Sequence, residues 1–175
     1  MEWIQEKNTL LVCDSEQIKP REKIAAFDMD YTIISVKSGA KFPKNRSDWE
    51  WWDESVPAKL KELHQDNYKI VIFTNQAGIE KKKQKPGDLQ GKIFDMCKEL
   101  GFPVQCFMAT ATDIHRKPNT MMWDILKTKY NADVEIDLQK SVYVGDAAGR
   151  KKDWKKGAGK DHSCDDRKAN NCSIK

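Results

Sequence analysis

Short apolar runs recur along this chain between polar segments. Four of them predict strands, at residues 24–27, 68–73, 103–108 and 141–144, and the first of these reads as a buried strand. A fifth run, Thr9–Cys13, predicts an edge strand ahead of the first of these. Each run is short and bounded by polar or turn-forming residues, as is typical of strands rather than of buried helices.

Amphipathic segments follow the strands. Helix signals predict one helix that begins near Ser55, a second over 86–100 that stops at Gly101, and a third over 119–130. Residues 35–54 predict a polar loop that carries aromatic residues. Because strands and helices alternate, we predict an α/β fold in which a parallel sheet has helices on both faces.

Length and composition fit one globular domain. The chain has 175 residues, of which 39% are hydrophobic and 33% charged. We therefore predict a single domain over residues 1–175, with a flexible or truncated segment at about 155–175. No apolar run is long enough to cross a bilayer and the N-terminus has no signal-peptide pattern, so we expect no membrane partner.

The five cysteines are scattered and form no Cys-x-x-Cys pair. This spacing indicates neither a zinc site nor a disulfide framework, and it favours a reducing intracellular setting.

Positive charge is clustered although the net charge is only +4. One cluster is Lys81–Lys83 with Lys85, and another runs from Arg150 to Lys152 and on to Lys155, Lys156 and Lys160. Such clusters are usually solvated loops, but they can contact the phosphates of nucleic acid if they flank a phosphate site.

Polar groups that suit phosphate chemistry follow each of the four predicted strands. Asp28 and Asp30 follow the first, Thr74 the second, Lys117 the third and Asp146 the fourth. Because the carboxyl ends of parallel strands meet at one edge of a sheet, we expect these side chains to lie together.

The residue types at this edge suit phosphoryl transfer. Asp28 could attack phosphorus, and Asp30 could protonate the leaving oxygen and later activate water. Thr74 and Lys117 could bind the phosphoryl oxygens, and Asp146 could share Mg²⁺ with Asp28. The plainer alternative for the aspartate pair is a strand end capped by an Asx turn.

These motifs resemble the four motifs of the haloacid dehalogenase superfamily of phosphotransferases. Finer matches resemble the phosphatase domain of the polynucleotide kinase 3′-phosphatase family. They include Phe73-Thr74-Asn75-Gln76, Arg116-Lys117-Pro118 and Tyr143-Val144-Gly145-Asp146-Ala147-Ala148-Gly149-Arg150. The resemblance runs from about Trp3 to Asn170.

The resemblance implies a Rossmann-like haloacid dehalogenase fold without a large cap domain, and a 3′-phosphatase that acts on DNA ends in nuclear strand-break repair. Catalytic roles fall to Asp28, Asp30, Thr74 and Lys117, and substrate-binding roles to Thr32, Asn75, Arg116 and Arg150. Mg²⁺ would be held by Asp28, the main-chain carbonyl of Asp30, Asp146 and one further acid. Asp161 and Asp166 both fit that last position; we name Asp166 as the candidate ligand, and the sequence leaves the choice between the two open. No protein partner can be read from the sequence.

The chain departs from the family pattern in three respects. Tyr31 stands where the family commonly has glycine. The sequence also ends before the family's usual last strand, and residues 168–171 look shortened. A kinase P-loop is not expected either, because Asp161 follows Gly159-Lys160.

An open site suits a large substrate. Residues 35–54 hold only a loop, and no separate cap fits between Thr74 and Lys117. Trp49, Trp51 and Trp52 could stack on exposed bases, although we expect at least two of them to pack in the core.

Two alternatives stay open. One is a capless small-molecule phosphatase of the histidinol-phosphate or heptose-bisphosphate type, which typically carries a cysteine-rich zinc loop that this sequence lacks. The other is a non-catalytic module that binds DNA ends, against which the intact Asp28, Asp30 and Asp146 argue.

Overall fold

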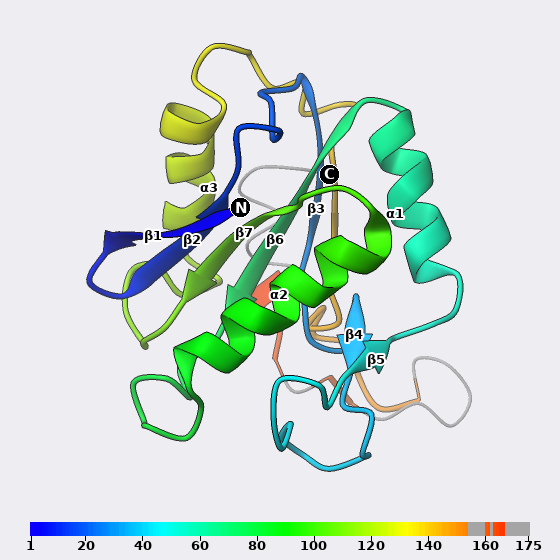
Figure 1. The fold of residues 1–175 in the computed structure, drawn as a ribbon, viewed down its shortest axis with the longest axis vertical. Coiled ribbons are helices and arrows are strands. Elements are labelled where there is room, and N and C mark those ends of the chain that lie inside the picture. Colours follow the sequence, from blue (N-terminus) through cyan, green and yellow to red (C-terminus); the bar gives the residue numbers. More distant parts are fainter. Residues whose placement is uncertain (154–159, 162, 167–175) are drawn as a thin grey trace.

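A six-stranded sheet forms the centre of the computed structural model, which describes residues 1–153, 160–161 and 163–166 (Figure 1). The strands lie in the order β1-β2-β7-β6-β3-β8. Their bounds are β1 Glu2–Lys7, β2 Leu10–Asp14, β3 Lys23–Phe27, β6 Tyr68–Asn75, β7 Gln105–Ala109 and β8 Val142–Val144.

The four strands predicted from apolar runs are parallel to one another. β3 pairs with β6 and β8, and β6 pairs with β7. The remaining two strands run the other way, since β2 is antiparallel to β7 and β1 to β2. The prediction of an edge strand at Thr9–Cys13 was therefore wrong, because β1 lies outside it. β1 escaped prediction because it has no buried residue, which suits a sheet edge.

Helices cover both faces of the sheet, as predicted. Side chains alternate along a strand, so neighbouring residues of β6 enter different cores. Ile70 and Ile72 pack with α1 (Val56–Gln65) and α2 (Pro86–Leu100), and Val71 and Phe73 pack with α3 (Met121–Ile125). In Figure 1, α2 crosses in front of the sheet.

Two helices differ in how well the sequence predicted them. α2 has the predicted bounds, and Gly101 ends it with a left-handed φ of 85°. The helix predicted over 119–130 is regular only in α3 and continues as a π-helical segment, Leu126–Tyr130 (η1). The Thr128 hydroxyl donates to the Asp124 carbonyl at 2.7 Å, and this bond competes with the regular helical ladder.

The connections leave the carboxyl edge of the sheet open. The predicted loop 35–54 contains only a small strand pair, β4 (Ile34–Ser35) and β5 (Glu50–Trp51). Between β6 and Lys117 lie α2 and β7. No large cap therefore occurs within the described residues, in agreement with the predicted capless fold.

Most of the segment predicted to be flexible or truncated, 155–175, lies outside the described residues. Within the part that the structure describes, no helix is both long and apolar enough to cross a membrane.

Candidate active site

A pocket of about 170 Å³ lies at the carboxyl edge of the parallel strands. The four residues predicted to be catalytic line it together: Asp28, Asp30, Thr74 and Lys117. Asp28 and Asp30 follow β3 directly, whereas Thr74 lies at the end of β6, which runs two residues beyond its predicted limit. The polar side chains that follow the parallel strands therefore lie together at one edge of the sheet, as expected.

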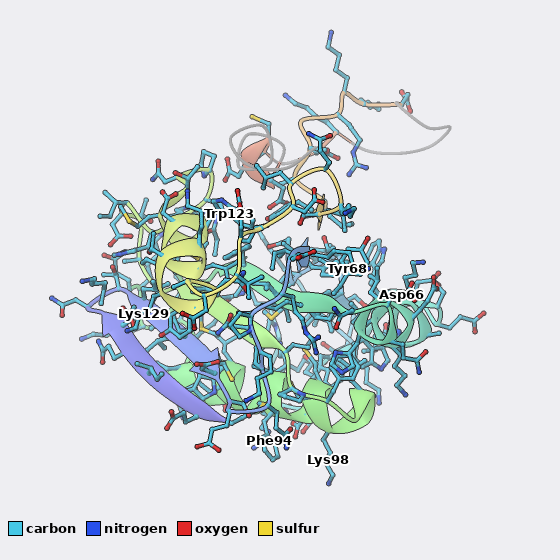
Figure 2. All side chains as sticks on the ribbon, turned by 90° about the horizontal axis from the view of Figure 1, so that it is seen from above. Asp66, Tyr68, Phe94, Lys98, Trp123 and Lys129 are labelled. Atoms are coloured by element: carbon cyan, nitrogen blue, oxygen red, sulfur yellow. The ribbon has the colours of Figure 1, made fainter. Side chains whose placement is uncertain are left out.

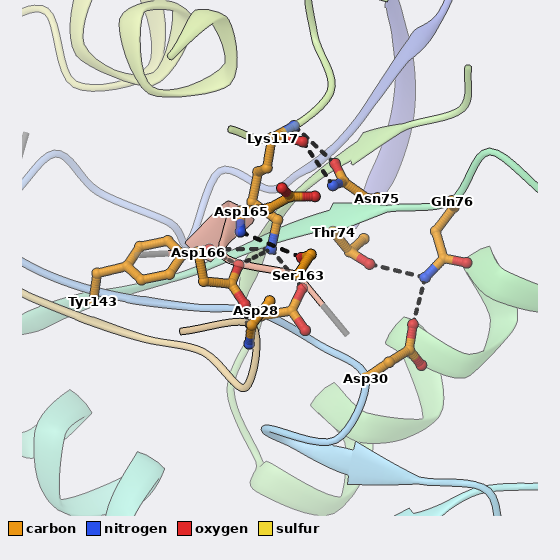
Figure 3. A network of polar contacts seen from close by, with 11 residues as sticks. Asp28, Asp30, Thr74, Asn75, Gln76, Lys117, Tyr143, Ser163, Asp165 and Asp166 are labelled. Atoms are coloured by element: carbon orange, nitrogen blue, oxygen red, sulfur yellow. Dashed lines mark hydrogen bonds and ion pairs between the residues drawn. The ribbon is translucent and has the colours of Figure 1, made fainter. Parts of the chain in front are cut away.

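Lys117 lies between two buried carboxylates (Figure 3). Its Nζ lies 2.6 Å from Asp28 Oδ1 and 2.6 Å from Asp166 Oδ1, and 3.1 Å from the Tyr143 hydroxyl. Burial disfavours the charged ammonium, but the adjacent Asp28 and Asp166 more than offset this and raise the pKa of Lys117. Lys117 therefore stays protonated and brings a fixed positive charge to the pocket.

The two aspartates after β3 differ in their surroundings. Burial raises the pKa of Asp28 to about 7, against the opposing effect of the Lys117 ammonium. Burial also raises the pKa of Asp30, which accepts a hydrogen bond from Gln76 Nε2 at 2.7 Å. A carboxyl with a raised pKa can hold a proton near neutral pH, as a general acid must.

Gln76 connects Asp30 to Thr74. The same Nε2 group that contacts Asp30 donates to Thr74 Oγ1 at 2.8 Å, so one buried amide fixes both side chains. In the sequence, Gln76 belongs to the motif Phe73-Thr74-Asn75-Gln76, which predicts no role for this glutamine. Its function as a support depends on contacts that the sequence does not show.

Asn75 faces both the pocket and the backbone of Lys117. Its Oδ1 accepts from the Lys117 N–H at 2.9 Å and its Nδ2 donates to the Lys117 carbonyl at 3.1 Å. Predicted as a substrate ligand, Asn75 here pairs with the chain that carries Lys117. Arg116, the next residue back along that loop, lines the pocket as expected.

The other two predicted substrate ligands do not line the pocket. Arg150 donates from Nε to Asp161 Oδ2 at 2.8 Å and from Nη2 to the Asp146 carbonyl at 2.8 Å. Thr32 Oγ1 is buried and has no hydrogen-bond partner among the described residues. The structure therefore does not bring Arg150 or Thr32 to the phosphate position.

Three carboxylates meet where the metal was predicted. Asp28, Asp146 and Asp166 each place an oxygen within 4.8 Å of the others. Oxygen donors of this kind are those that Mg²⁺ prefers, so the residues fit that ion. The cluster contains no carboxylate oxygen from Asp30, whose predicted contribution was a main-chain carbonyl.

Asp166 and Asp161, the two acids left open by the sequence, have different partners. Asp166 accepts from the Ala147 N–H at 3.0 Å and from the Tyr143 hydroxyl at 2.8 Å. Asp161 pairs with Arg150 instead. A side chain at Gly145 would overlap the Asp166 carboxylate, which explains why glycine precedes Asp146.

The fold resembles that of solved haloacid-dehalogenase-like phosphatases. A Mesorhizobium loti structure described as a HAD-like phosphatase superimposes with a TM-score of 0.65 at 17% identity, over 81% of this chain and 72% of that one. D,D-heptose 1,7-bisphosphate phosphatase of B. bronchiseptica, crystallised with magnesium and phosphate, gives a TM-score of 0.58 at 23% identity, over 71% and 70%. Both likenesses concern the fold alone.

The family is defined by the sequence match. Residues 23–175 match the model of the polynucleotide kinase 3 phosphatase family, and this chain belongs to that family.

Named relatives agree with this membership. A Schizosaccharomyces pombe bifunctional polynucleotide phosphatase/kinase is 41% identical over 143 residues, which are 82% of this chain and 35% of the relative. A 20.8 kDa protein of Autographa californica nuclear polyhedrosis virus is 44% identical over 132 residues, 74% and 69% of the two chains. An Arabidopsis thaliana polynucleotide 3′-phosphatase is 34% identical over 165 residues, 86% and 23%. The chain thus spans about a third of the yeast relative and about a quarter of the plant relative.

Proposed function

We propose that this chain is a Mg²⁺-dependent polynucleotide 3′-phosphatase that removes 3′-phosphates from DNA ends during strand-break repair in the nucleus. The observation that carries the proposal is the contact of Asp28 with Lys117 in a pocket that Asp30, Thr74 and three metal-compatible carboxylates share. Membership of the family and the names of the yeast and plant relatives support the substrate class.

The first step forms an aspartyl-phosphate. A carboxylate oxygen of Asp28 attacks phosphorus, the bond from phosphorus to the 3′-oxygen breaks, and Asp30 gives its proton to the departing oxygen. Lys117 favours the ionised form of Asp28 and offsets the charge of the phosphoryl oxygens, and the Thr74 hydroxyl binds one of those oxygens.

The second step releases phosphate. Asp30, now ionised, takes a proton from a water molecule as that water attacks phosphorus, and the bond between Asp28 and phosphorus breaks. Gln76 keeps Asp30 in place for both transfers. Mg²⁺ held by Asp28, Asp146 and Asp166 would add positive charge beside the phosphoryl group and between the carboxylates.

A basic groove beside the catalytic acid supports a polyanionic substrate. The groove has a volume of about 210 Å³, and its lining includes Lys44, Lys83, Lys85 and Lys92 against a single acid, Asp88. Lys92 is only 3% exposed, and no described residue forms a hydrogen bond or ion pair with its ammonium. Its charge nevertheless acts on Asp30, whose pKa it lowers against burial.

The groove supports a nucleic-acid end over a small phosphate ester as the substrate. Burial lowers the pKa of Lys92 although Asp30, Asp48 and Asp88 act in the opposite direction, and a phosphodiester in the groove would further favour the charged ammonium. Lys81 and Lys82, in the same loop as Lys83, are exposed, as is typical of residues that contact a flexible backbone.

The test compares substrates. With Mg²⁺, the protein should release phosphate from a 3′-phosphorylated oligonucleotide with a much higher kcat/KM than from histidinol phosphate or a heptose bisphosphate. The reverse order would establish the small-molecule phosphatase. Tight oligonucleotide binding without release of phosphate from any substrate would establish the non-catalytic module.

A further inference from the structure

An exposed aromatic pair stands at the mouth of the catalytic pocket. Tyr31 is 43% exposed and Trp52 is 53% exposed. Their ring centroids are 5.9 Å apart and the rings meet edge to face, with an interplanar angle of 86°. Tyr31 immediately follows Asp30 and lines the pocket, and Trp52 adjoins the pocket through its contact with Tyr31.

Main-chain hydrogen bonds position the backbone of both residues close to the aspartates that follow β3. The Tyr31 N–H donates to the Ile34 carbonyl at 2.7 Å, and the Trp52 N–H donates to the Ile33 carbonyl at 2.9 Å. Both residues are therefore tied to the turn that follows β3. They form a rim with a defined position rather than a pair on a free loop.

The two preceding tryptophans do not share this exposure. Trp49 and Trp51 meet edge to face at 5.3 Å and pack against the core, and Trp51 Nε1 donates to Glu99 at 2.8 Å. The expectation that at least two of the three tryptophans pack in the core is thus confirmed. Trp52 is the one of the three that presents its ring to solvent.

Tyr31 occupies a backbone conformation that disfavours a side chain. Its φ is 59°, in the left-handed region where glycine is the residue without strain. The tyrosine ring is nearly half exposed, so core packing does not compensate this conformation. A strained residue beside a catalytic group is a reason to seek a functional role.

We propose that Tyr31 and Trp52 bind the terminal nucleobase of the strand whose 3′-phosphate occupies the pocket. The inference rests on the proposed function. A phosphate held at Asp28 is joined through its 3′-oxygen to a deoxyribose, which must lie at the pocket mouth with its base beside it. Tyr31 lies at that mouth, and stacking on aromatic rings accepts any of the four bases.

The test uses two oligonucleotides that differ only at the 3′-phosphorylated terminal residue, which carries a base in one and is a stable abasic residue in the other. Loss of one stacked base should lower kcat/KM of the wild-type protein by about tenfold. Tyr31→Gly and Trp52→Leu should lower kcat/KM for the substrate with a base, and should reduce the ratio between the two substrates toward one.

Two controls separate stacking from damage to the fold. Gly adopts the φ of residue 31 without strain, so Tyr31→Gly should unfold at or above the wild-type temperature. Phe94→Ala removes another exposed aromatic residue, which projects from α2 (Figure 2), and should keep the wild-type ratio. A 2-aminopurine base at the terminal position should be quenched on binding to the wild-type protein and less quenched by either variant.

The outcomes distinguish this inference from the function on which it rests. Turnover of both oligonucleotides at equal kcat/KM by the wild-type protein would overturn the stacking role and leave the 3′-phosphatase intact. An unchanged ratio in Tyr31→Gly and Trp52→Leu would do the same. No turnover of either oligonucleotide, with turnover of a small phosphate ester, would overturn the 3′-phosphatase and the stacking role together.

Discussion

A buried cluster of two ion pairs and an exposed ion pair have similar N–O distances and opposite surroundings. Lys117 lies 2.6 Å from Asp28 and from Asp166, and the exposed fractions of the side chains are 4%, 12% and 4%. Arg46 lies 2.5 Å from Asp95, and the two side chains are 45% and 32% exposed. The first cluster adjoins the catalytic pocket, and the second ties the loop before β5 to α2.

The comparison shows that length alone does not say what an ion pair does. Water screens the Arg46–Asp95 pair, which therefore contributes little to stability. Removing Lys117, Asp28 and Asp166 from water carries a desolvation cost. Their mutual attraction outweighs it for Lys117 and Asp166, whereas burial prevails at Asp28 and raises its pKa. In the buried cluster Lys117 favours the ionised forms of Asp28 and Asp166, while the Asp166 carboxylate raises the pKa of Asp28.

The largest expected effect comes from Asp28→Asn. The amide is nearly isosteric but is a poor nucleophile, so turnover of a 3′-phosphorylated oligonucleotide should fall by about 10⁴-fold or more. Circular dichroism should show an unchanged fold. Turnover within tenfold of the wild-type protein would remove Asp28 from the role of nucleophile.

The dependence of turnover on Mg²⁺ tests the proposed metal site at Asp28, Asp146 and Asp166. A chelator should abolish turnover, Mg²⁺ should restore it, and excess Ca²⁺ should inhibit, since Ca²⁺ prefers more ligands at longer distances. Asp166→Asn should raise the Mg²⁺ concentration for half-maximal activity by about 10- to 100-fold.

Asp161→Asn is the matched control, because Asp161 pairs with Arg150 rather than with the carboxylate cluster. It should leave the Mg²⁺ requirement unchanged. Equal effects of the two substitutions, or full activity in a chelator, would contradict the assignment of the metal site.

The loss of turnover in Asp30→Asn should depend on the leaving group of the substrate. A deoxyribose 3′-oxygen needs a proton as it departs, so turnover of an alkyl ester should fall by about 10²- to 10⁴-fold. An aryl phosphate has a leaving group that needs little protonation and should lose much less. Equal losses on the two substrates would mean that Asp30 only orients other groups.

Removing charge from the basic groove should have a smaller effect on turnover than the substitutions above, and this effect should depend on salt. Lys92→Met should raise KM for an oligonucleotide by several-fold, and should reduce the slope of log affinity against log salt by about 0.7 if one phosphate contact is lost. Lys98→Met is the control, because Lys98 projects from the exposed face of the same helix (Figure 2).

Charge reversal of Lys81, Lys82 and Lys83 should enlarge this effect, and the same change at Lys151 and Lys152 tests the second predicted cluster. A flat salt response with unchanged oligonucleotide KM would mean that these lysines are solvated loop charge. That result would favour the small-molecule phosphatase.

The smallest effect is expected from Asp95→Asn. Arg46 lowers the pKa of Asp95, so the pair stabilises the fold only while this carboxyl is ionised. The contribution is present above the ordinary pKa of 3.8 and is lost as the pH falls through the lower folded value. At pH 7 the unfolding midpoint should shift by a few degrees at most, with turnover unchanged, and the difference should disappear in acid. A large loss of stability at pH 7 would show that solvent exposure does not limit how much the Arg46–Asp95 pair stabilises the fold.

Local sequence patterns predicted the parts of the fold that depend on burial and chain ends. Apolar runs marked the four parallel strands, and Pro86 and Gly101 marked the bounds of α2. Because parallel strands end at one edge, strand positions alone predicted that Asp28, Thr74 and Lys117 would meet. These features were readable because each depends on a short segment and a general rule of sheet topology.

Only the tertiary structure decided which side chains touch. Lys117 and Asp28 are 89 residues apart, and Lys117 and Asp166 are 49 apart, so no local pattern encodes their contact. The same holds for the choice of Asp166 over Asp161 beside Asp28, and for the support that Gln76 gives to Asp30. Hydrogen-bond partners depend on ångström-scale positions that the whole packed chain fixes, whereas periodicity reports only which face of a segment is buried.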